Sequence, residues 1–383
     1  MLRAGVGVST LADPRRAAVR AAEEALAGAG RCDAAILWTG PAEAAAVPDL
    51  LAAATGALGS ETVVGATAHG VLAREREHVA EPAVAVLAMA GIEAEPFLVP
   101  DVAGAERAAG DEIAARLPGA GCERDLVVLF PDPRTLDPEA LLGALGDRLG
   151  SARIVGAGSA DPVSGAPLQW CGREVASGAL SGIALRSAAP ARIGITQACR
   201  PATPLLTVTR CLGHWVLELD GRPALEVYRE VARSPLASDL RRAAAFVLVA
   251  LPIDPEAEAL APGSYLVRHA IGFEEKTNAF AIPEAPRRGQ RIALAQREPE
   301  AAREDLKAML AGLAGTPPAL GLYLDCCARA MPFFGVPDLE AAYLARAFEG
   351  VPIGGVLGSC EIGPIGRVPR LLTYTGVLAL LDA

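Results

Sequence analysis

Short apolar runs alternate with amphipathic, helix-forming stretches along most of the chain, and three groups of them follow the same order. Each group consists of an apolar strand, a helix, a strand interrupted by glycine, and a returning apolar strand. The groups begin at Ala34–Trp38, Leu126–Phe130 and Leu320–Leu324. A supersecondary unit that recurs within a chain indicates its architecture before any single motif does.

The third element of each group carries its glycine after two apolar residues, at Gly65, Gly156 and Gly354. A glycine inside an apolar strand weakens the strand unless another group approaches the backbone closely. These glycines therefore mark either tight packing or the floor of a ligand pocket. The repeated β-α-β-β modules predict an α/β protein of layered mixed β-sheets covered by helices, in two tightly packed halves.

The pattern changes between about residues 191 and 300, where short strands replace the regular alternation. The strands are expected at residues 192–196, 205–209, 214–219, 246–251, 265–273 and 291–295. Helices are predicted at about residues 13–27, 135–149, 224–233 and 299–313, and the second of these starts beside Asp137-Pro138, which is typical of a helix entry. The domain boundary is expected between residues 190 and 215.

Composition narrows the class of protein. The chain has 383 residues, an apolar share of 52% and a net charge of −10, which together indicate a globular protein and argue against a nucleic-acid surface. It contains no apolar run near the roughly 18 residues that span a bilayer, and its first residues read as a strand rather than a signal peptide. We therefore expect a cytoplasmic protein without membrane insertion. Its eight cysteines lack zinc-type spacing, and its four histidines form no metal motif.

Several motifs occur in an order that resembles the FIST family. In the first half they are Gly5–Thr10 and Val64–Val71; in the second, Leu217–Ala224 precedes a helix. Cys326–Ala330 and Cys360–Pro364 match the end of the pattern. The resemblance covers nearly the whole chain, as a FIST N-terminal domain at residues 1–205 and a FIST C-terminal domain at 206–383.

The resemblance implies a sensory module of signal transduction that binds a small ligand such as an amino acid. Some bacterial members resemble haem-dependent nitric oxide sensors, so haem is the alternative cofactor. The chain leaves no residues for a kinase, cyclase, receptor or F-box segment. We therefore expect it to signal to a separate protein partner.

Candidate ligand contacts gather at the strand ends of the third module. Cys326 and Arg329 follow its first strand, where open α/β sheets bind ligands and where a helix end and the guanidinium would lower the pKa of the thiol. Glu361 follows the next strand, where it either meets a ligand amine or pairs with Arg329. Gly363 permits an unusual backbone path beside it. For each of these four residues, the alternative to a ligand contact is an ordinary structural role in packing or in an ion pair.

Three further residues complete the candidate set. Arg268 and Arg297 lie in strand-like segments, where a guanidinium suits carboxylate recognition or a structural ion pair. His69 lies at the end of the glycine strand of the first module. It is expected to be a pocket residue, a haem ligand or a surface histidine.

Three functions therefore remain open at this point. The first is a small-molecule sensor, the second a haem-based gas sensor, and the third a hydrolase with Cys326 as its nucleophile. The sequence shows neither a nucleophile elbow nor a dinucleotide or phosphate-binding glycine motif, so an enzyme is the weaker class.

Overall fold

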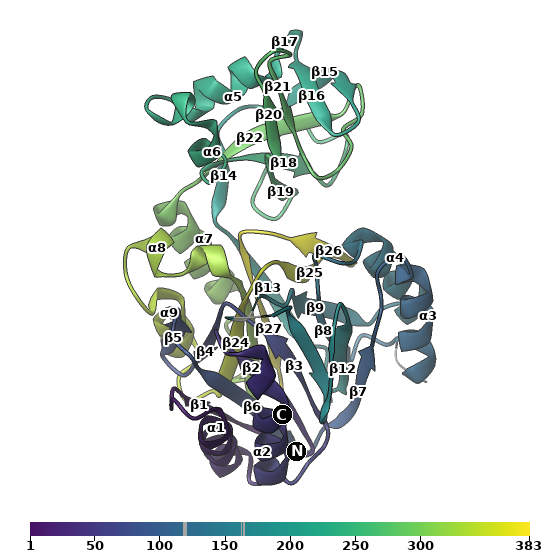
Figure 1. Ribbon diagram of the computed structural model, residues 1–383, viewed down its shortest axis with the longest axis vertical. Helices are drawn as coiled ribbons and strands as arrows, with labels where there is room; N and C mark the ends of the chain where they lie inside the picture. The colour runs from purple at the N-terminus through teal and green to yellow at the C-terminus, as the bar shows by residue number, and fades with distance from the viewer. Residues whose placement is uncertain (118–120, 162, 164) are drawn as a thin grey trace. The chain divides into compact units, whose positions relative to one another are not determined.

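The computed structural model describes residues 1–117, 121–161, 163 and 165–383, and the chain forms two compact units (Figure 1). The first unit takes residues 1–195 and 307–383, and the second takes residues 196–306. The first unit is therefore built from both ends of the chain. The expected division at residues 205 and 206 concerns family regions and stays a prediction.

Each predicted module builds one six-stranded sheet of the first unit. The first sheet has the order β1 (Arg3–Ser9), β6 (Val84–Ala90), β2 (Ala34–Thr39), β3 (Val63–Thr67), β10 (Leu168–Cys171) and β11 (Glu174–Ser177). The second has the order β7 (Glu93–Val99), β12 (Leu180–Arg186), β8 (Asp125–Pro131), β9 (Arg153–Ala157), β25 (Glu361–Ile365) and β26 (Val368–Leu372). The third has the order β13 (Arg192–Gln197), β27 (Thr375–Leu381), β23 (Leu320–Cys326), β24 (Ile353–Gly358), β4 (Gly70–Ala73) and β5 (Arg76–Val79).

The same pairing recurs in all three sheets, which confirms the predicted α/β fold with mixed sheets. In each, the returning strand runs antiparallel to the first strand of the module, which in turn runs parallel to the glycine strand. The apolar runs become these central strands because residues buried on both faces read as continuous apolar segments.

The hairpin that follows each glycine strand joins the sheet of a different module. The β4–β5 hairpin pairs with β24, the β10–β11 hairpin pairs with β3, and the β25–β26 hairpin pairs with β9. Each of the three sheets is therefore completed by another module, and the modules interlock in a ring. The sequence pattern missed these hairpins because their strands are short and carry polar residues such as Arg76 and Glu77.

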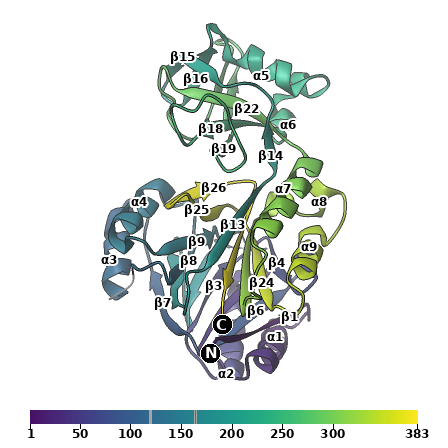
Figure 2. The same ribbon diagram turned by 180° about the vertical axis from the view of Figure 1, so that it is seen from behind.

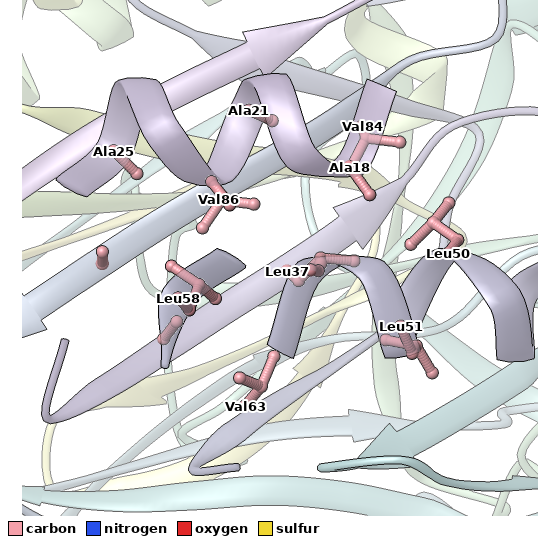
Figure 3. Close-up of a cluster of buried hydrophobic side chains, with 14 of the residues drawn as sticks. Ala18, Ala21, Ala25, Leu37, Leu50, Leu51, Leu58, Val63, Val84 and Val86 are labelled. Carbon is pink, nitrogen blue, oxygen red and sulfur yellow. The ribbon is translucent and has the colours of Figure 1, made fainter. Parts of the chain in front are cut away.

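Helices cover the sheets with small or aliphatic side chains. Over the first sheet lie α1 (Pro14–Ala29) and α2 (Val47–Leu58), with a 3₁₀ turn η1 (Ala44–Ala46) before α2. Figure 3 shows Ala21 and Ala25 of α1 above Val86 of β6. A Cβ added at Gly5 would lie 2.0 Å from the carbonyl oxygen of Ala25, so alanines and glycines allow α1 to lie unusually close to β1.

Helices also cover the other two sheets of the first unit (Figure 2). The second sheet carries α3 (Glu106–Arg116) and α4 (Pro138–Leu149). α4 begins at Pro138, three residues after the predicted start at about residue 135, and Asp137 caps it: the Asp137 carboxylate accepts hydrogen bonds from two backbone N–H groups of the first turn. The remaining helical segments after residue 298 are α7 (Pro299–Gly312), η3 (Cys327–Arg329), α8 (Met331–Phe334) and α9 (Leu339–Ala347).

The second unit contains a nine-stranded sheet. Its strands are β14 (Cys199–Pro201), β15 (Leu206–Leu212), β16 (Trp215–Leu219), β17 (Arg222–Pro223), β18 (Val247–Pro252), β19 (Tyr265–His269), β20 (Gly272–Glu274), β21 (Ala279–Ala281) and β22 (Arg291–Arg297). Its helices are α5 (Ala224–Ala232), η2 (Leu236–Ser238) and α6 (Leu240–Ala243). The single strand expected at residues 265–273 is two strands, β19 and β20, so that expectation was wrong in its extent.

The glycines of the first two modules are packing positions. A Cβ at Gly65 would lie 1.7 Å from the carbonyl oxygen of Leu37, and one at Gly156 would lie 2.4 Å from that of Leu129. We expect Gly65→Ala to lower the free energy of unfolding by about 3 kcal/mol or more, because the neighbouring backbone must move.

Gly56→Ala is the matched control for that substitution, since Gly56 is exposed within α2 and nothing lies within 4 Å of an added Cβ. It should raise stability by about 0.5–1 kcal/mol. Urea unfolding of both variants measures the difference. Equal effects would contradict the close approach of β2 to Gly65.

Candidate functional site

Arg329 lies in a buried charge network at the end of β23. Its Nη2 lies 2.5 Å from Oε1 of Glu340, at the start of α9, and its Nε lies 3.1 Å from Oδ1 of Asp325. The hydroxyl of Tyr323 donates a 2.8 Å hydrogen bond to the same oxygen of Glu340. None of these side chains is more than 1% exposed. The guanidinium is therefore bound within the fold rather than presented to solvent.

A third carboxylate, Glu77 of β5, extends this network. Its Oε1 accepts hydrogen bonds from the backbone N–H groups of Glu340 at 3.0 Å and of Ala341 at 3.3 Å, which caps the start of α9. Burial and the nearby Glu340 carboxylate raise the pKa of Glu77 to about 7. Burial, followed by Glu340, also raises the pKa of Asp325 well above its ordinary value. Two carboxyl groups, of Asp325 and Glu340, therefore share the guanidinium of Arg329, and the raised pKa values of Glu77 and Asp325 favour protons bound to these two carboxyl groups.

Cys326 does not have the environment that the sequence suggested. A hydrogen bond with Cys327 and then burial raise the pKa of its thiol, so the expected lowering was wrong. The physical reason is that η3 is a single turn with little dipole, and Arg329 turns to Glu340 and Asp325. The structure therefore favours the neutral thiol.

Glu361 pairs with Thr375 instead of Arg329, so the suggested ion pair was wrong. Its Oε2 accepts hydrogen bonds from the Thr375 hydroxyl at 2.7 Å and from the Thr375 backbone N–H at 3.1 Å. Burial, followed by the nearby Cys326, raises the pKa of Glu361 well above its ordinary value. Gly363 lies beside it in β25, where an added Cβ would meet Leu372 at 3.1 Å, so packing surrounds this glycine.

His69 lies at the junction of β3 and β4, where its backbone N–H donates to the carbonyl of Leu357 at 3.0 Å. Burial lowers the pKa of its imidazole, while the carboxylate of Asp161 opposes that shift. A neutral imidazole is a competent metal ligand. Haem binding at His69 stays a prediction, and we derive no haem chemistry from this residue. Among the described residues, no three metal-binding side chains cluster for a metal ion.

The two candidate arginines belong to the second unit. Arg268 of β19 is 3% exposed; its Nε donates to Oε1 of Glu284 and its Nη1 to the carbonyl of Val267 at 2.9 Å. Arg297 ends β22, where its Nη1 donates to the carbonyl of Ala245 at 3.1 Å. The candidates thus divide between the units, with five in the first and these two in the second.

A pocket of about 520 Å³ in the second unit contains charged groups that the sequence analysis missed. Its lining residues are Pro252, Pro255, Glu256, Glu284, Ala285, Arg287, Arg288, Gly289, Gln290 and Arg291. Oε2 of Glu284 is buried and has no hydrogen-bond partner within the described chain. The adjacent Arg287-Arg288 pair, three and four residues after Glu284, was the available sequence signal, but only the fold brings Pro252, Pro255 and Glu256 to the same pocket.

Arg268 reaches this pocket indirectly, through Glu284. Because the buried guanidinium holds Oε1 of Glu284, the orientation of that carboxylate is fixed while Oε2 is left for another donor. Neither Arg287 nor Arg288 forms a side-chain ion pair in the part of the chain that the structure describes. The residues that line the pocket therefore carry one oriented carboxylate and two guanidinium groups.

No helix of the described residues combines the length and apolar character needed to span a bilayer.

Comparison with known proteins gives a family for the whole chain. The FIST N domain matches residues 33–222 and the FIST C domain matches residues 224–364. An uncharacterised protein of Mycobacterium tuberculosis (strain H37Rv) is 30% identical over 386 residues, covering 99% of each chain. An uncharacterised protein of Mycobacterium bovis is 29% identical over 387 residues, covering 99% of this chain and 98% of its own.

Among solved structures, a cyanuric acid hydrolase from A. caulinodans matches 48% of this chain and 71% of its own, with 14% identity and a TM-score of 0.26. A similarity that low carries no argument about fold or activity. The two domain matches, by contrast, span most of the sequence and confirm the resemblance drawn from its motifs. The chain therefore belongs to the FIST family, whose domains are associated with sensory signal transduction.

Proposed function

We propose that this protein is a small-ligand sensor that binds an amino acid, or a similar zwitterion, in the pocket of the second unit. The observation that carries the proposal is the buried, unpartnered Oε2 of Glu284 in a pocket that also contains Arg287 and Arg288. A carboxylate and guanidinium groups together complement the ammonium and carboxylate of an amino acid. The volume of about 520 Å³ lies within the range of small-molecule sites.

The division of roles follows from the hydrogen bonds already described. Glu284 accepts from the ligand ammonium, because Arg268 has fixed the carboxylate and a buried acceptor without a donor is costly. Arg287 and Arg288 bind the ligand carboxylate, for which a planar guanidinium is suited. Binding shifts the population toward the ligand-binding conformation, and a separate protein partner recognises that conformation.

The pKa of Cys326 bears on the hydrolase alternative. A thiolate is the reactive nucleophile, and burial together with the Cys327 hydrogen bond disfavours it. We therefore keep ligand sensing as the proposed function and assign Cys326 no catalytic role.

A thermal-unfolding screen against amino acids and small carboxylates tests the proposal. A ligand at 100 times its dissociation constant adds about 2.7 kcal/mol to the stability of the folded state, which raises Tm by several degrees. We expect Glu284→Gln to abolish the shift caused by amino acids, since the neutral amide loses the charge that attracts the ammonium.

Glu258→Gln is the control, because Glu258 is exposed in the same loop region and is absent from the pocket lining. The double variant Arg287→Gln/Arg288→Gln should lose the response to simple carboxylates as well. A shift that survives both pocket variants, or no shift with any amino acid, would remove this pocket as the sensor site.

A further inference from the structure

Residues of α7 and α9 line a second groove in the first unit. Figure 2 shows the two helices beside each other. It has a volume of about 670 Å³ and is lined by Lys307, Leu310, Ala342, Tyr343, Arg346 and Ala347. The ammonium group of Lys307 lies 5.6 Å from the centre of the Tyr343 ring. The groove therefore combines an aromatic and aliphatic floor with two cationic side chains.

Helix periodicity places these residues on one side of each helix. In α9, Ala341 and Leu344 are buried beneath the helix, whereas Ala342 and Arg346 are exposed one turn apart. In α7, Lys307 is exposed, while Leu310, one turn on, is only 6% exposed and supplies apolar surface. The cations thus flank the apolar surface instead of covering it completely.

The charge of the groove is unusual for this chain. The protein has a net charge of −10 and only two lysines, Lys276 and Lys307. Within the described residues, neither Lys307 nor Arg346 forms an ion pair, whereas Arg303, one turn before Lys307, pairs with Glu300 at 3.0 Å. Two cations without counter-ions beside apolar surface favour an anion with an apolar body.

We propose that the α7–α9 groove binds a small amphipathic anion, with an aromatic or short aliphatic body and a single carboxylate or sulfonate group. The body packs on Tyr343 and Leu310, and the anionic group lies between Lys307 and Arg346. The lining of α9 extends over residues 342–347, about 7.5 Å along the helix, which matches a ring system rather than a long peptide.

The probe for this site is 8-anilinonaphthalene-1-sulfonate, an aromatic sulfonate whose fluorescence rises in apolar surroundings. We expect the folded protein to bind it saturably and hexanoate to displace it. Lys307→Gln/Arg346→Gln should weaken binding at least tenfold, because both charges that meet the sulfonate are removed. Tyr343→Leu should weaken the binding of the aromatic probe more than it weakens the binding of hexanoate.

The control is Arg16→Gln/Arg107→Gln, which removes two exposed cations from α1 and α3 and leaves the same net charge as the groove variant. Its affinity for the probe should equal that of the unmodified protein. Glu284→Gln should also retain full affinity, so this result is independent of amino-acid binding in the second unit. Absence of saturable binding, or equal affinity in the groove and control variants, would overturn the proposal.

Discussion

The Arg329→Met variant is expected to lose about 3–5 kcal/mol of its free energy of unfolding, the usual effect of removing one partner of a buried ion pair. Arg329 is fully buried, and it is the cation paired with Glu340 at 2.5 Å and Asp325 at 3.1 Å. Methionine fills much of the space but leaves these carboxyl groups without their counter-charge. Urea unfolding at pH 7 measures the loss.

The matched control is Arg15→Met, which removes an arginine whose 2.6 Å pair with Asp49 lies at the surface, with side chains 64% and 61% exposed. That variant should lose less than about 1 kcal/mol, because water solvates both charges after the pair is broken. Adding Glu340→Gln to Arg329→Met should recover part of the stability, since one uncompensated carboxylate disappears. Similar losses in the two single variants would contradict the central place of Arg329 in the network.

The stability of the protein is expected to fall as the pH rises from about 4.5 to 7. Glu77 has a pKa of about 7 in the fold against an ordinary value of 4.5, so the folded state binds more protons than the unfolded state across this interval. Its contribution is complete below pH 4.5 and is lost as the pH passes 7. One pKa unit corresponds to about 1.4 kcal/mol, so the full loss from Glu77 is about 3 kcal/mol. Asp325, whose pKa is also raised, acts in the same direction.

Glu77→Gln removes this part of the pH dependence while an amide oxygen can still accept from the start of α9. Glu75→Gln is the control, since it makes the same change at an exposed position of the same hairpin. The free energy of unfolding should be measured in urea at pH 5 and pH 8. The difference between these values should shrink in Glu77→Gln and persist in Glu75→Gln, and identical differences in both variants would disprove the assignment to Glu77.

At lower pH the free energy of unfolding is instead expected to fall as the pH falls. The Arg186 pair and backbone N–H groups hold the pKa of Asp125 below its ordinary value of 3.8, despite the opposing effect of burial. Its contribution is present above pH 3.8 and is lost as the pH falls through its lower folded value. The protein should therefore be most stable at mildly acidic pH.

Much of the fold could be predicted because its signals are local. The continuous apolar runs became the central strands β2, β8 and β23, since strands buried on both faces have little room for polar residues. The start of α4 was readable from Asp137-Pro138 because a cap depends on neighbouring residues alone. The family motifs were readable for the same reason.

The candidate site was harder to predict than the fold, because the residues that contact one another there are distant in sequence. The hydrogen bond between Glu77 and Glu340 joins residues 263 positions apart. No sequence pattern near either residue predicts this contact. Arg329 and Glu361 looked like a ligand pair because both follow apolar strands, yet each has other partners inside the fold. Arg268 was recognised as a candidate from the sequence. Glu284 became a candidate only when the structure showed that its side chain pairs with that of Arg268.

The sequence by itself determined the three modules, the central strands and the family, because burial and helix capping act over a few residues. Tertiary structure alone decided that the β4–β5, β10–β11 and β25–β26 hairpins complete other modules, since strand partners are chosen by backbone hydrogen bonds across the whole unit. It also decided which charges are neutralised internally and which, as at Arg287 and Lys307, face a pocket or groove. Electrostatic energies depend on distance and burial in space, and neither is fixed by separation along the chain.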